Sequence, residues 1–241
     1  MKKRKVASTS RRSLLKWGVC GLGAFALTTL PKQLTAQTSN GIKTLTFNAD
    51  DIGILNFALL LEELEAAFYL LVLKSGKITD PTELDYMRAL GAHEAEHVVF
   101  LRSVLGEDTT FRTKDLSFNR SGLDALLTDR KTILNAAVAL EDTGVHAYNG
   151  AGPSLKNPIF LLAAGSIVSV EARHAAGARA LLGRPATEPD SDRAVSEADL
   201  VPELNPFKGR AYDELYTPKQ IVAIVGSLNI LNNPINGTLV A

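Results

Sequence analysis

The 241-residue sequence predicts an all-α protein built on a four-helix bundle that consists of two helix pairs. Apolar residues recur at helical spacing in four long segments, whereas no long segment alternates polar and apolar residues as strands do. In addition, residues 93–106 and 170–183 align without a gap. This alignment indicates that the chain contains two copies of one helix pair.

The first helix pair is predicted between Asp50 and Gly106. Apolar side chains recur on one face from Asp50 to Leu73, which we expect to be the first helix. Asp80-Pro81 supplies an N-cap and a first-turn proline for the second helix. This helix is expected to reach about Leu105, where Gly106 can end it.

The second pair is predicted between Gly122 and Leu182. Its first helix is expected from about Gly122 to Tyr148, with a break near Thr128 left open. Asn157-Pro158 begins the next helix, which is expected to end at Leu182.

Beyond the bundle, the pattern is weaker. Residues from Pro185 to Pro218 are rich in Pro, Asp and Glu and are interpreted as an extended surface connection. Thr217-Pro218 can begin a short fifth helix through Leu228, and residues 232–241 are expected to be irregular. The predicted organisation is therefore a leader (1–36), a linker (37–49), the bundle (50–185) and a C-terminal extension (186–241).

The leader resembles a twin-arginine export signal. Four basic residues precede Ser-Arg-Arg-Ser-Leu-Leu-Lys at positions 10–16, in which Arg11 and Arg12 are the critical pair. An apolar run of residues 17–30 follows, and it is shorter than a typical membrane span. We expect the twin-arginine translocase to export the protein to the periplasm or beyond. A retained membrane anchor is the alternative.

Removal of the leader changes the charge and the available chemistry. Residues 1–36 hold eight Lys and Arg and no acidic residue, so the remainder has 18 basic and 26 acidic residues and a net charge of −8. This balance argues against nucleic acid as a partner. The only cysteine, Cys20, also lies in the leader. Any metal site in the exported chain must therefore use carboxylates and imidazoles.

The repeat contains the candidate metal ligands. HEAEHVVFLRSVLG (93–106) and VEARHAAGARALLG (170–183) share Glu-x-x-His, which is Glu94 with His97 in the first half and Glu171 with His174 in the second. Val170 stands opposite His93, so the HExxH pattern of zinc proteases occurs in one half only.

A second correspondence lies upstream of each Glu-x-x-His. Glu62 is followed by Tyr69 seven residues later, and Glu141 is followed by Tyr148 at the same interval.

The glutamate and histidine of each Glu-x-x-His lie at i and i+3 and therefore share one face of the helix, and in both halves this face is apolar. Four glutamates and two imidazoles on such faces require cations, and two divalent ions would neutralise the four carboxylates.

The chain resembles ferritin-like domain proteins of the bacterial, desiccation-related type. NFALLLEELEAAFY (56–69), LEDTGVHAYNGA (140–151) and VEARHAAGARALLG (170–183) carry the resemblance, together with HEAEH. The resemblance implies two metal ions, most simply iron or manganese, with bridging ligands from Glu94 and Glu171. It implies that the other ligands are Glu62, His97, Glu141 and His174.

Several neighbouring residues keep alternative roles. Glu65 could replace or supplement Glu62, whereas Glu63 points away from the apolar stripe and is expected to be solvated. Tyr69 and Tyr148 either reach toward the centre as hydrogen-bond donors or redox residues, or are core aromatics. Arg102 and Arg179 recur at one position and either pair with nearby carboxylates or are solvated. His146 is expected at the surface or between helices.

These features favour an exported di-metal oxidoreductase that acts on peroxide, O2 or ferrous iron under oxidative or desiccation stress. A non-catalytic protective or interaction module with a structural metal site is the alternative, and an HExxH zinc protease is a remote one. The sequence does not distinguish a monomer from a homo-oligomer.

Overall fold

A computed structural model describes residues 41–187 and 213–241. The predicted export signal, with Arg11 and Arg12, and most of the connection expected after Pro185 lie outside the described residues.

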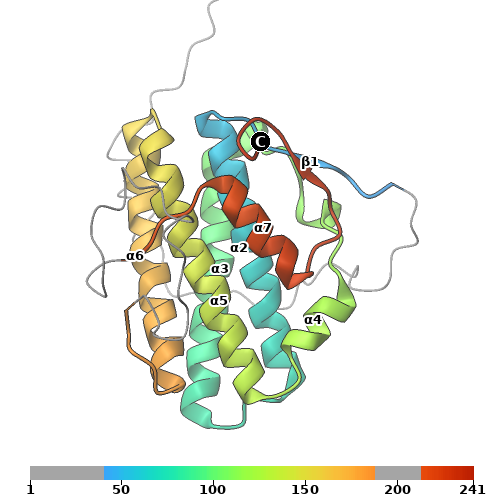
Figure 1. Ribbon diagram of the computed structural model, residues 1–241, viewed down its shortest axis with the longest axis vertical. Helices are drawn as coiled ribbons and strands as arrows, with labels where there is room; N and C mark the ends of the chain where they lie inside the picture. Colours follow the sequence, from blue (N-terminus) through green and yellow to red (C-terminus); the bar gives the residue numbers. More distant parts are fainter. Residues whose placement is uncertain (1–40, 188–212) are drawn as a thin grey trace, which may run out of the picture. The chain divides into compact units, whose positions relative to one another are not determined.

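Four long helices form the bundle, in the two pairs that the repeat predicts (Figure 1). The first pair is α2 (Asp51–Ser75) and α3 (Pro81–Leu105), and the second is α5 (Arg130–Ala151) and α6 (Pro158–Leu181). The bounds of all four agree with the sequence prediction to within a few residues at each end, apart from the start of the third helix. The predicted all-α bundle is confirmed.

Local capping explains where the helices begin. The Asp50 side chain accepts a hydrogen bond from the backbone N–H of Gly53 at 2.7 Å, and Asp80 caps α3 in the same way. The break near Thr128 is also present, because α4 (Arg120–Leu126) is separate from α5 and Asp129 caps the new helix. Asn157 caps α6, with Pro158 in its first turn.

Helix α2 is the central element of the bundle. It packs chiefly against α3, while α5 packs chiefly against α6, and the two pairs meet mainly along α2 and α5. Seventeen residues of α2 are buried, and they lie on almost every side of the helix between Gly53 and Val72. A helix that is apolar on most sides is typical of a core position. Polar side chains in the middle of α2 therefore point into protein.

The C-terminal segment is packed onto the bundle, and its short helix α7 (Pro218–Leu228) confirms the predicted fifth helix. Figure 1 shows α7 lying across the bundle beside α5. Ile221 and Val225 of α7 are buried. Just before α7, the ring centre of Tyr216 lies 4.4 Å from that of His146. His146 is thus an interior residue, at 3 % exposure, that lies between the bundle and this segment.

Helix α5 and residue 216 approach so closely that the contact requires glycine. A Cβ atom at Gly150 would lie 1.9 Å from the carbonyl oxygen of Tyr216. Any side chain at position 150 would therefore displace the C-terminal segment.

The two ends of the described chain pair with each other, which the sequence did not predict. Strand β1 (Leu45–Thr46) pairs in parallel with β2 (Ile235–Asn236), with Leu45 opposite Ile235. Phe47 follows β1 and is fully buried. Residues 45–46 and 235–236 thus form a short parallel pair within segments that the sequence predicted to be a linker and an irregular end.

Three short 3₁₀ helices lie within the connections between the longer helices: Gly106–Asp108, Thr113–Asp115 and Gly152–Ser154. Asn233 of the C-terminal segment contacts the second of these helices, because its side-chain amide donates to the carbonyl oxygen of Asp115. The same amide donates to the carbonyl oxygen of Lys43, in the segment before β1.

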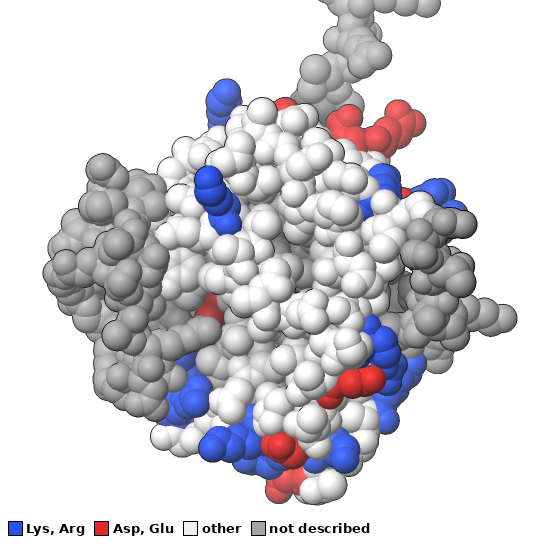
Figure 2. All heavy atoms as spheres, turned by 45° about the vertical axis from the view of Figure 1, so that its right-hand side comes forward, with Lys and Arg blue, Asp and Glu red and all other residues white. Residues whose placement is uncertain are grey.

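By length and hydropathy alone, α6 is the one described helix that could cross a membrane. A core helix passes the same test, and α6 carries buried Glu171, His174 and Arg179 as the fourth helix of the bundle. Figure 2 brings forward the right-hand side of Figure 1, and on this face Lys and Arg are interspersed with Asp and Glu and gather mainly toward the lower end.

Candidate metal centre

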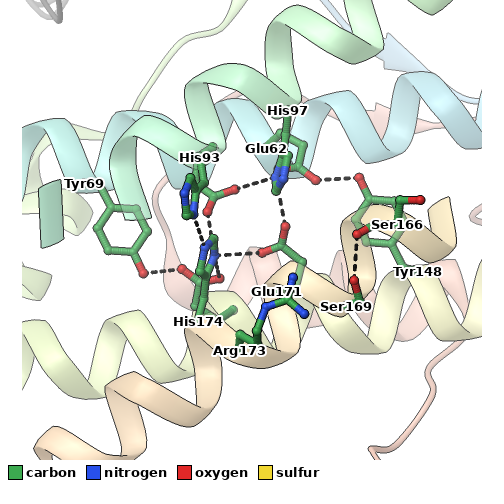
Figure 3. Close-up of polar contacts among 12 residues, drawn as sticks. Glu62, Tyr69, His93, His97, Tyr148, Ser166, Ser169, Glu171, Arg173 and His174 are labelled. Carbon is green, nitrogen blue, oxygen red and sulfur yellow. Dashed lines mark hydrogen bonds and ion pairs between the residues drawn. The ribbon is translucent and has the colours of Figure 1, made fainter. Parts of the chain in front are cut away.

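The structure brings the six predicted ligand side chains together inside the bundle, one set from each helix (Figure 3). They form two groups whose oxygen and nitrogen atoms lie within 4.8 Å of one another. The His97 group consists of Glu62, Glu94, His97 and Glu171. The His174 group consists of Glu94, Glu141, Glu171 and His174. Glu94 and Glu171 belong to both groups, as expected of shared ligands.

Three carboxylates converge on one nitrogen of His97. Its Nδ1 atom lies 3.1 Å from Glu62 Oε2, 3.1 Å from Glu94 Oε2 and 3.0 Å from Glu171 Oε1. A ring nitrogen carries at most one hydrogen, so it cannot donate full hydrogen bonds to three acceptors. The arrangement is instead that of four possible metal-ligand atoms, one nitrogen and three oxygens, around a common point.

The His174 group repeats this arrangement. The Nδ1 atom of His174 lies 2.9 Å from Glu94 Oε1, 3.1 Å from Glu141 Oε2 and 3.5 Å from Glu171 Oε2. The equivalence follows from the repeat, because each histidine lies one helical turn after its glutamate on the same face.

The donor set fits divalent cations. Glu94 Oε1 and both carboxylate oxygens of Glu171 are buried, and among the described residues none accepts a hydrogen bond of normal geometry. Buried carboxylate oxygens without donors are strongly disfavoured, and a cation would satisfy them. Oxygen and imidazole ligands without thiolate suit iron and manganese, and they also suit zinc. The cluster is therefore compatible with a two-metal site.

Burial and mutual repulsion control the ionisation of the outer carboxylates. Burial is the largest cause that raises the pKa of Glu62 to about 8, and the negative charge of Glu171 adds to it. Burial also raises the pKa of Glu141 well above its usual range, with Glu94 as the main repelling charge. Without cations, Glu62 therefore holds a proton at neutral pH.

The histidines and shared glutamates shift in the opposite sense. Burial disfavours imidazolium, but contacts with Glu171, Glu62 and Glu94 outweigh it and raise the pKa of His97 to about 12. The same balance, led by Glu141 and Glu171, raises the pKa of His174 to about 11. Burial also opposes ionisation of Glu171, yet the neighbouring imidazoles lower its pKa to about 2. In the metal-free protein, the positive charges of the His97 and His174 imidazolium groups thus stabilise the neighbouring carboxylates, as metal ions would.

Two tyrosines cross between the helix pairs to reach the outer carboxylates. Tyr69 of α2 donates its hydroxyl hydrogen to Glu141 of α5, and Tyr148 of α5 donates to Glu62 of α2. Both tyrosines are buried, so they are core aromatics and hydrogen-bond donors at once. Figure 3 shows them at opposite ends of the cluster.

Glu65 is a fifth buried carboxylate beside the cluster, but it is in neither group. The repeat places Gly144 opposite it, and a Cβ atom at Gly144 would lie 3.3 Å from Glu65 Oε1. The Glu65 side chain therefore uses the space left by the missing side chain of Gly144. Burial, followed by the charges of Glu171 and Glu141, raises its pKa well above the usual range.

His93 lies at the solvent-exposed edge of the cluster and belongs to neither group. A zinc-protease site would need His93 and His97 on one ion, with Glu94 as a base near water. Glu94 is fully buried and faces both His97 and His174. The geometry therefore does not support the HExxH interpretation.

Two acid–arginine pairs occupy equivalent positions in the repeat, one partly buried and one fully buried. Arg102 donates to Glu63, and Arg179 Nη2 donates to Asp142 Oδ2 at 2.6 Å. The expectation that Glu63 is solvated was wrong, because α2 is buried on that side too. The sequence contained a signal for both pairs, since an acid follows Glu62 and Glu141 directly and an arginine recurs downstream.

A four-helix bundle with Glu-x-x-His on two of its helices and an inward-pointing carboxylate on each of the other two is the arrangement found in di-metal carboxylate bundles, and this cluster is compatible with such a site. A family model described as the ferritin-like domain matches residues 50–184. The match covers more than half of the chain, which therefore belongs to the ferritin-like domain family. A comparison with curated proteins gave no match.

Proposed function

We propose that the cluster holds two divalent metal ions, iron or manganese, and that the protein is an oxidoreductase for peroxide, O2 or ferrous iron. Glu62 and His97 would hold one ion, and Glu141 and His174 the other. Glu94 and Glu171 would bind both. Four carboxylates and two divalent ions give a neutral cluster, which a buried position favours.

One observation carries this proposal: in each half, a single histidine nitrogen faces three carboxylate oxygens at 2.9–3.5 Å. Protons alone satisfy such a cluster poorly, because one N–H cannot serve three acceptors. A cation bound by the imidazole lone pair and the carboxylates satisfies all of them.

Two iron or manganese ions bound close together can exchange two electrons with peroxide or O2. The protein residues supply position and enclosure. Tyr69 and Tyr148 fix the outer carboxylates, and burial of the four glutamates keeps bulk water away from them. Exclusion of water strengthens every charge interaction inside the site.

We place this chemistry outside the cytoplasm, after export by the twin-arginine translocase, in oxidative or desiccation stress. The basic stretch and the Arg11-Arg12 pair support export. Because this route carries folded proteins, the metal ions can be bound before the protein meets competing ions outside.

Metal analysis joined to turnover tests the proposal. Protein purified from its native compartment is expected to contain two iron or manganese ions per chain and to consume peroxide, O2 or Fe(II). A Glu94→Gln, Glu171→Gln double variant removes both shared carboxylates and is expected to lose metal and turnover together. Metal-replete protein that consumes none of the three substrates would contradict the redox proposal.

The contacts between helices favour a structural role as the second candidate. Most contacts of the bundle lie within each helix pair, and the cluster joins the pairs. Metal ions there would hold α2 and α3 to α5 and α6. In that case chelation would lower the melting temperature of a protein that shows no turnover.

A further inference from the structure

Two positions near the cluster break the repeat between the two halves of the chain. Glu65 stands opposite Gly144, and His93 stands opposite Val170. Glu65 lies beside Glu171, which belongs to both groups, because a Cβ atom at Gly144 would lie 3.3 Å from Glu65 Oε1 and 3.5 Å from Glu171 Cγ. His93 contacts the histidine of one group only. It is therefore the residue that makes the two halves of the cluster unequal.

The His93 ring forms an in-plane contact with the His174 ring (Figure 3). Nδ1 of His93 lies 2.8 Å from Nε2 of His174. The ring planes differ by 13° and the ring centres are 5.1 Å apart. This separation is about the nitrogen–nitrogen distance plus the two ring radii. The rings therefore meet edge to edge, as a hydrogen bond requires, and not face to face.

Each ring nitrogen of His174 therefore has a defined neighbour. Nδ1 faces the three carboxylates of its group, and Nε2 faces His93. An imidazole that binds metal through Nδ1 carries its hydrogen on Nε2, and that hydrogen can be donated to Nδ1 of His93. Among the described residues, Nε2 of His97 has no such partner, and the repeat offers it only Val170.

We infer that His93 is a positioning residue that makes the His174 group the tighter of two unequal metal subsites. It fixes the ring orientation of His174 and accepts the Nε2 hydrogen, so that Nδ1 faces the carboxylates and is the nitrogen that gives up its hydrogen when an ion binds. The His97 group has an equivalent outer carboxylate that accepts from a tyrosine, and it contains the same two shared glutamates. In the described part of the chain, it lacks a second histidine that contacts the Nε2 atom of its own histidine. Two ions would therefore bind in sequence, the first in the His174 group. The inference rests on the proposed two-metal function.

Calorimetric titration of the metal-free protein with Mn2+ tests this inference. The wild type is expected to bind two ions in two resolved steps. His93→Val copies the other half of the repeat, and it is expected to weaken the tighter step by about 10–100-fold, the usual effect of losing the partner of a metal-binding histidine. The weaker step should change little. His93→Asn keeps an acceptor near the position of Nδ1 and should retain most of the affinity.

Glu96→Gln supplies the control, because Glu96 is an exposed residue of the same helix outside both groups. A melting curve of each metal-free variant separates loss of fold from loss of affinity. A wild type that binds no Mn2+ would overturn the metal proposal and this inference together. Two bound ions with a tight step unaffected by His93→Val, or with both steps weakened equally, would overturn the role of His93 alone.

Discussion

The hydroxyl of Tyr148 donates to the carboxylate of Glu62, 86 residues earlier in the chain. The partner contact from Tyr69 to Glu141 runs in the opposite direction between the same two helices, α2 and α5. Each tyrosine thus fixes the outer carboxylate of the other helix pair. Two hydrogen bonds beside the cluster, one in each direction, therefore join the two helix pairs.

These hydrogen bonds predict that the two tyrosines act on different subsites. Tyr148→Phe removes the donor to Glu62 and should weaken metal binding by the His97 group, whereas Tyr69→Phe should weaken the His174 group. The expected loss is about 10–100-fold in each case, because the carboxylate keeps its charge but loses its orientation. Mn2+ titration of both variants measures it. Equal weakening of both steps by either variant would show that the tyrosines do not act separately.

Two neighbouring glutamates allow a direct comparison of the ligand choice on α2. Glu62→Gln removes a member of the His97 group and should lower the metal content from two ions per chain toward one. Glu65→Gln changes a buried carboxylate of neither group and should leave two ions bound. Elemental analysis after metal loading and desalting gives the stoichiometry. The reverse pattern would assign the ligand to Glu65.

The Arg179–Asp142 pair is expected to matter for stability in a non-additive way. The side chains of both residues are at most 4 % exposed. Arg179→Met removes the guanidinium that pairs with the buried carboxylate of Asp142 and should lower the free energy of unfolding by about 3–5 kcal/mol. The double variant Arg179→Met, Asp142→Leu should recover much of this loss. Urea unfolding of the metal-free proteins measures both. A double variant less stable than Arg179→Met would contradict the pairing as the cause.

The stability of the metal-free protein should fall as the pH rises above about 6.5. The carboxylates raise the pKa of His97 to about 12 and of His174 to about 11, from 6.5 in an unfolded chain. The folded state therefore holds more protons than the unfolded state above pH 6.5, and its stability decreases with pH until the folded histidines titrate. Glu62 acts in the same direction, because its pKa is raised from 4.5 to about 8.

Thermal melts between pH 6 and pH 9 check this dependence. The melting temperature of metal-free protein should decline across the range, and metal-loaded protein should not show the decline, because its ions replace these protons. A metal-free melting temperature that rises over the same range would contradict the assigned protonation.

The sequence predicted the four long helices and the clustering of the six acid and imidazole side chains, because both depend on short-range periodicity and on the repeat. Caps such as Asp50 and Asp80 fixed helix starts locally. The pairing of Glu62 with Glu141 selected the outer carboxylates, and the structure brings both to the cluster.

The errors came from long-range packing. Residues 45–46 pair with residues 235–236, and no local pattern of a two-residue strand identifies a partner 190 positions away. Glu63 was expected to be solvated because helical geometry assumes one wet face. Helix α2 is surrounded by α3, α5 and the segment near Thr113, which donates its hydroxyl to Glu63. Burial of that side follows from the whole fold and not from the helix alone.

X-ray diffraction at the iron and manganese absorption edges, on crystals of protein purified from its native compartment, tests the central claim most directly. Two anomalous peaks are expected for each chain, one beside His97 and one beside His174, with Glu94 and Glu171 in contact with both. Absence of any peak among these residues, or a single peak between His93 and His97, would contradict the two-metal assignment.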